Sequence, residues 1–95
     1  MNNGLPLQPA PDVPVFVCLA ILARTGDAGR LTARDARLAG VEAEGNSERE
    51  VLTALLKRFK EVVAEYVSRA EEIPFREPPD QPAADEFLRR IPVHL

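Results

Sequence analysis

The fold of this chain is decided by residues 47–70, which read SEREVLTALLKRFKEVVAEYVSRA. Ser47 followed three residues later by Glu50 is a capping box, the signature of a helix start. Beyond it, apolar residues recur at spacings of three and four, as on one face of an α-helix: Leu52, Leu55, Leu56, Phe59, Val62, Val63, Tyr66, Val67 and Ala70. The pattern predicts an amphipathic helix about 36 Å long, which ends before Pro74.

Three strands are predicted before this helix. Residues 15–22 read VFVCLAIL and are apolar at every position, which is typical of a strand covered on both faces. The turn residues 25–29 separate them from a second strand at 30–37, whose polar residues indicate one face in water. A third strand is expected at 41–44, because apolar and acidic residues alternate there with Val41 and Ala43 inward.

The segment after the helix, residues 71–86, is acidic and proline-rich. It carries six carboxylates against one arginine, a net charge of −5, and the rest of the chain sums to +2. Four prolines exclude regular structure through most of it, and the composition is that of a solvated linker. The apolar stretch 87–95 then predicts a last strand, held at a sheet edge because Pro92 cannot donate a ladder hydrogen bond.

Together these elements predict an α+β fold in the order β-β-β-α-β, with one long helix on one face of a small antiparallel sheet. We expect residues 14–95 to form a single domain and residues 1–13 to form a flexible proline-rich arm. One helix leaves the second face of the first strand uncovered, and so small a domain is marginally stable alone. We therefore expect a homodimer or higher oligomer.

Composition also excludes several classes of protein. A single cysteine cannot form a disulfide scaffold within the chain. The longest apolar run, residues 13–23, is too short to span a bilayer, and no basic residue precedes it as in a signal peptide, so we expect a cytoplasmic protein. A net charge of −3, and Phe16 as the only aromatic residue in the first three strands, argue against nucleic acid as a partner.

No group of residues in the sequence has the pattern of a catalytic site. His94 is the only histidine, and Cys18 lies within an apolar run where a thiol is inert. Asp35, Glu42 and Glu44 could form a carboxylate cluster for a divalent metal, but the polar face of a half-solvated sheet carries such residues routinely. Lys57, Arg58 and Lys60 are typical of a solvated helix face. We expect no catalytic residue, cofactor or metal.

The junction before the helix resembles a known family. Residues 40–51 read GVEAEGNSEREV, and Gly40, Gly45, Ser47 and Glu50 match the pattern Gly-Cys-x-x-x-Gly-x-[Thr/Ser]-x-x-Glu-Ala of HicB-like antitoxin domains. Val41 replaces the usual cysteine and Val51 the usual alanine. The resemblance implies a βββαβ fold, a non-catalytic role, oligomerisation and binding to a small toxin ribonuclease. We expect no room here for the DNA-binding module that many members carry.

This resemblance gives the leading functional expectation, a protein-interaction module that neutralises a small basic toxin. The alternative is a stand-alone oligomeric protein of the same fold that binds a different partner or a small ligand. In the leading interpretation, acidic side chains attract the toxin and the segment orders on contact, while the last strand offers a sheet edge. The expected partner-binding residues are Glu71, Glu72, Glu77, Asp80, Arg89, Ile91 and Val93.

Overall fold

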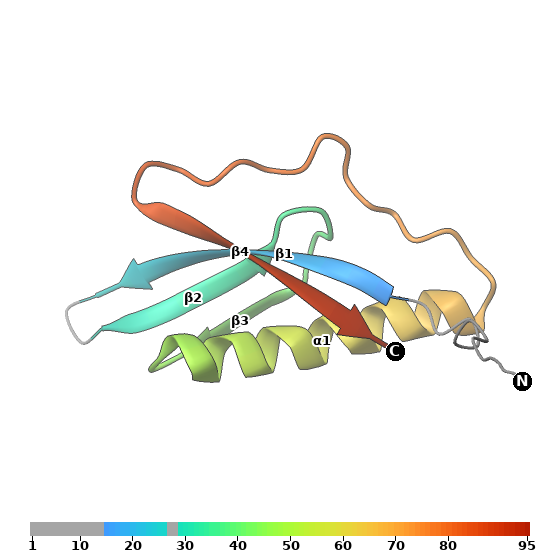
Figure 1. Cartoon of the computed structure of the whole chain (residues 1–95), viewed down its shortest axis with the longest axis horizontal. Coiled ribbons are helices and arrows are strands. Elements are labelled where there is room, and N and C mark those ends of the chain that lie inside the picture. The colour runs from blue at the N-terminus through green and yellow to red at the C-terminus, as the bar shows by residue number, and fades with distance from the viewer. Residues whose placement is uncertain (1–14, 27–28) are drawn as a thin grey trace, which may run out of the picture.

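The chain folds into one antiparallel sheet with a helix packed on one face (Figure 1). The computed structural model describes residues 15–26 and 29–95, so the predicted arm 1–13 lies outside the described residues. The sheet order is β3-β2-β1-β4, and every neighbouring pair is antiparallel. The predicted α+β class and element order are confirmed. The elements are β1 (Val15–Thr25), β2 (Arg30–Asp35), β3 (Glu42–Gly45), α1 (Glu48–Ser68) and β4 (Glu86–His94).

The bounds of all four strands differ from the predicted ones, by one residue at β3 and β4 and by more at β1 and β2. β1 continues to Thr25, three residues beyond the apolar run, because Thr25 pairs with Arg30 and extends the hairpin. β2 ends at Asp35 instead of residue 37. There the Asp35 carboxylate accepts hydrogen bonds from the backbone N–H groups of Arg37 (2.7 Å) and Leu38 (2.9 Å), which turns the chain out of the sheet.

The core lies between α1 and the helix-facing side of the sheet. Four helix residues are fully buried, and each is four positions after the last, as one line along a helix requires: Val51, Leu55, Phe59 and Val63. They pack against Cys18, Ala20 and Leu22 of β1. The predicted stripe was wrong at both ends, because it omitted Val51 and because Val67 and Ala70 are exposed.

The second face of β1 is covered only in part. Ile21 is 1% exposed, whereas Val15 and Val17 are 55% and 37% exposed. The cover near Ile21 comes from this chain itself, since Arg34 pairs with Ile21 in the sheet and binds Glu86 and Asp80. Within one chain the cover is therefore present at Ile21 and absent at Val15 and Val17, where the expected oligomer would have to supply it.

The last strand lies where the sequence predicts. β4 pairs with β1 along its whole length, from Val15 with His94 to Ala23 with Glu86, and forms one edge of the sheet. α1 lies mainly over β3 and β2 and less over β1. The helix is thus displaced from β4 toward the opposite edge of the sheet.

Candidate functional site

The acidic segment between α1 and β4, residues 71–85 (the crossover segment), is attached to the domain. The backbone N–H of Arg76 donates to the carbonyl of Arg37 (2.7 Å), and that of Asp80 donates to the carbonyl of Ala36 (2.9 Å). Figure 1 shows the segment arching from the end of α1 to the start of β4. The expectation that this segment orders only on contact is therefore wrong, because the bend after β2 already holds it. The expected solvent exposure and lack of regular structure are confirmed, since most of its residues are exposed and none is in a helix or strand.

An aromatic contact adds to this attachment. The Arg37 guanidinium lies 4.6 Å from the centre of the Phe75 ring. The centre of the Phe16 ring lies 6.4 Å from the centre of the same Phe75 ring. Arg37 also donates to the carbonyl of Val17 (2.6 Å). One arginine side chain thus joins β1 to the crossover segment, and a stacked arginine of this kind is worth about 0.5–2 kcal/mol.

The four acidic residues expected to bind a partner have different surroundings. Glu71, Glu72 and Glu77 are exposed. Glu71 pairs with Arg69 at 3.2 Å, and the Glu71 side chain remains accessible to solvent in this pair. Asp80 is half-buried and is held between Arg76 and Arg34. The structure therefore presents three of the four carboxylates to solvent, whereas Asp80 anchors the segment.

A second anchor lies where the crossover segment enters β4. Glu86 pairs with Arg34 at 2.9 Å and also accepts from the backbone N–H of Ala83 at 2.8 Å. The Arg34 hydrogen bond, followed by that of Ala83, lowers the pKa of Glu86 below its usual value. Glu86 therefore stays ionised at neutral pH and holds the strand entry to the sheet.

The three β4 residues expected to bind a partner are also placed differently from one another. Arg89 is exposed and pairs with Glu48 at the start of α1 (2.8 Å). Ile91 is half-buried against the core. Val93 is only 5% exposed, because it faces the helix beside Phe16. Of the three, only Arg89 is exposed.

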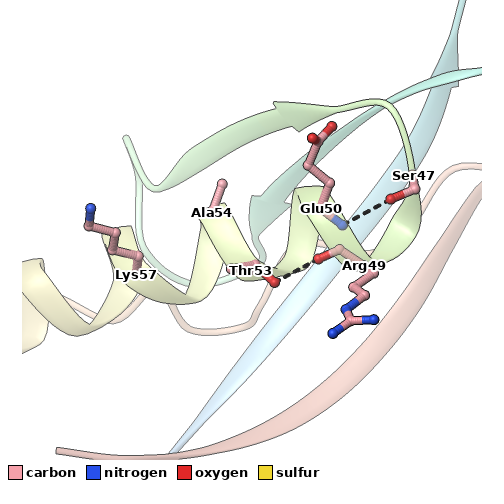
Figure 2. A pocket seen from close by; sticks show the side chains of 6 residues that line it. All are labelled: Ser47, Arg49, Glu50, Thr53, Ala54 and Lys57. Atoms are coloured by element: carbon pink, nitrogen blue, oxygen red, sulfur yellow. Dashed lines mark hydrogen bonds between the residues drawn. The ribbon is translucent and has the colours of Figure 1, made fainter.

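Three of the family-pattern residues, Gly45, Ser47 and Glu50, lie at the junction between β3 and α1, and Gly40 lies in the bend before β3. Ser47 accepts from the N–H of Glu50 (3.1 Å), and the Glu50 carboxylate accepts from the N–H of Asn46 (2.5 Å). Figure 2 shows this helix start and the shallow hollow beside it, whose side chains Arg49, Thr53 and Lys57 do not converge on a common point. Gly40 has φ +84°, and Gly45 lies against the first helical turn.

The residues considered for chemistry do not assemble into an active site. Cys18 is fully buried, and burial together with the nearby Asp35 carboxylate raises its pKa far above the usual value, so the thiol stays protonated. His94 is exposed at the end of β4. Asp35 lies on the helix side of the sheet, while Glu42 and Glu44 are exposed on the other face. Among residues 15–26 and 29–95, no three side chains are grouped as metal ligands.

The sequence pattern did not predict the structural roles of two residues, Asp35 and Arg37. Asp35 is 2% exposed, and Arg37 contacts both β1 and the crossover segment. An aspartate just before the bend 36–40 was a usable signal, because such residues often bond to the backbone two or three positions later. Nothing local predicted the role of Arg37, since its partners Val17 and Phe75 are far away in the chain.

Comparisons with protein-family models, with curated proteins and with solved structures find no match for this chain. In the part of the chain that the structure describes, no helix is long and apolar enough to cross a membrane.

Proposed function

We propose that this protein is a non-catalytic interaction module, similar to HicB-type antitoxins, that binds and neutralises a small basic toxin ribonuclease. The observation that carries the proposal is the attached crossover segment, with Glu71, Glu72 and Glu77 exposed on it. Carboxylates on an already ordered segment attract a basic protein without the entropic cost of folding that segment on binding.

Two further observations support the proposal. The element order β-β-β-α-β is the one that the resemblance implies. The Cys18 thiol, the only cysteine of the chain, is buried and protonated, so we propose no reaction at it.

The test is capture of a companion from source cells with the tagged protein and with a charge-reversal variant. Glu72→Lys together with Glu77→Lys reverses two exposed carboxylates of the crossover segment. Glu61→Lys together with Glu65→Lys is the matched control, because it makes the same charge change on the exposed face of α1. Surface pairs such as those of Glu61 and Glu65 contribute little to stability, so the control should fold.

The expected result is a small basic protein that the wild type and the control retain and the Glu72 and Glu77 variant loses. Its ribonuclease activity on a bulk RNA substrate should be inhibited by the wild-type chain in proportion to the amount added. The absence of a basic companion, or its equal retention by the charge-reversal variant, would contradict the proposal.

The alternative, an oligomeric protein with a different partner, is favoured by one observation. Val15, Val17 and Leu88 are at least 37% exposed, and they lie on the sheet face away from α1. A second copy could cover them. Sedimentation of the wild type at micromolar concentration should then show a dimer, which Val17→Glu with Leu88→Glu dissociates. Val67→Glu, at a helix position that is also exposed, is the control.

A further inference from the structure

The surface between α1 and β4 is an open groove with an apolar floor. One row of helix residues, spaced four apart, runs along β4: Glu48, Leu52, Leu56 and Lys60. Glu48 binds Arg89 at one end (2.8 Å), and Leu56 and Lys60 lie beside Pro92, Val93 and His94 at the other. The groove there has a volume of about 530 Å³.

The groove exists because the helix is displaced toward the opposite edge of the sheet. α1 covers mainly β3 and β2, so Leu52 and Leu56 on its flank and Ile91 on β4 remain half-buried. No described strand pairs with the outer side of β4. An antiparallel strand turns about half of its backbone N–H and C=O groups away from its neighbour. Pro92 has no N–H to donate, so the outward groups of the other β4 residues are the ones free to pair with an added strand.

The charges beside this edge are positive. Lys57 and Lys60 flank the groove on the helix side. Arg90 projects from the other face of β4 and is exposed, and in residues 15–26 and 29–95 no carboxylate lies within ion-pair distance of it. An added strand would meet apolar side chains in the groove and a cation at each face.

We propose that β4 accepts an extended segment of a partner protein, in which apolar residues that enter the groove alternate with acidic residues that face Arg90. This is strand addition to a sheet edge, in which main-chain hydrogen bonds supply affinity and the alternate side chains supply specificity. The surface is separate from Glu71, Glu72 and Glu77, so the inference does not rest on the proposed antitoxin role.

Two other occupants fit this edge less well. A second copy of β4 would bring a second Arg89-Arg90 pair to the same edge, and facing like charges destabilise a sheet. The preceding segment 1–14 contains four prolines, at positions 6, 9, 11 and 14, and proline cannot donate to a ladder. The same arginines that disfavour self-pairing attract an acidic strand, which is how one edge can discriminate between partners.

The test uses the full chain and three blocked synthetic peptides, followed by amide NMR spectra. The first peptide is Thr-Val-Glu-Val-Glu-Val-Thr, the second replaces both glutamates by lysine, and the third carries an N-methyl group on the central valine. Arg90→Glu is the test variant, and Arg58→Glu, on the solvent side of α1, makes the same charge change away from the groove.

The glutamate peptide should shift the amide signals of residues 86–94 and slow their hydrogen exchange. It should bind about tenfold more tightly than the lysine peptide, and N-methylation should abolish binding, because it removes a main-chain donor. Arg90→Glu should reverse the preference between the two peptides, while Arg58→Glu should leave it unchanged.

Three results would overturn the proposal. They are no amide shifts with the glutamate peptide at about 1 mM, shifts confined to residues outside β4 and the facing flank of α1, or an unchanged preference in Arg90→Glu. Protection of residues 86–94 that grows with protein concentration in the absence of peptide would instead assign the edge to a second copy, and would also overturn it.

Discussion

Replacing Gly45 by alanine tests the close contact between the end of β3 and the first turn of α1. Gly45 ends β3 and lies against the first turn of α1. A Cβ atom added there would lie 2.8 Å from the Val51 nitrogen and 3.1 Å from the Val51 Cα. Both are backbone atoms of a hydrogen-bonded helical turn, so no side chain can rotate away, and α1 must move from β3 to relieve the contact.

The expected cost combines two opposing effects. Overpacking a filled site costs about 1–3 kcal/mol. Removing a glycine from the unfolded chain returns about 0.4–1 kcal/mol, since the φ of Gly45 is not positive and alanine can adopt it. We therefore expect Gly45→Ala to lower the free energy of unfolding by about 1–2 kcal/mol, which lowers Tm by about 4–16 °C for a domain of this size.

Urea unfolding followed by far-ultraviolet circular dichroism measures this change, and Gly40 is the matched control. Gly40 has φ +84° with no atom within 4 Å of an added Cβ, so Gly40→Ala suffers from backbone conformation alone. Asparagine tolerates that conformation, so Gly40→Asn should be more stable than Gly40→Ala. At Gly45 the order should be the opposite, because the larger side chain is more crowded. A Gly45→Ala protein as stable as wild type would refute the steric reasoning.

Three other predictions concern single side chains. Ser47→Ala should lower the free energy of unfolding by about 1 kcal/mol, because it removes the cap on the Glu50 N–H, whereas Ser47→Asp should retain most of it. The lowered pKa of Glu86 means that its pairing with Arg34 stabilises the fold above pH 4.5, its ordinary pKa, and that this contribution is lost as pH falls further. Unfolding of Glu86→Gln between pH 7 and pH 3 should therefore show a smaller acid-dependent loss than wild type. Cys18 should react with a thiol reagent only after unfolding, because it is buried and protonated, and a native-state reaction at the rate of free cysteine would contradict its placement.

The candidate site was only partly predictable, and the reason differs from residue to residue. Glu72 and Glu77 were predicted to be exposed because charged residues in a proline-rich stretch rarely find a core. Val93 was predicted to bind a partner, yet it is buried, because the pairing register with β1 decides which β4 side chains face the helix. The groove beside Leu56 depends on where the helix axis lies over the sheet, and no local pattern records that.

The sequence by itself determined the elements and their order. The spacing of Leu55, Phe59 and Val63 and the Ser47 cap predict the helix, and Pro92 predicts the edge position of β4. These signals depend on the residues themselves and on neighbours a few positions away in the chain. Only the tertiary structure decided that the crossover segment is attached at Arg37 and that α1 lies mainly over β3 and β2, displaced from β4. Those features depend on contacts between residues that are far apart in the chain and that come together only when the helix packs on the sheet.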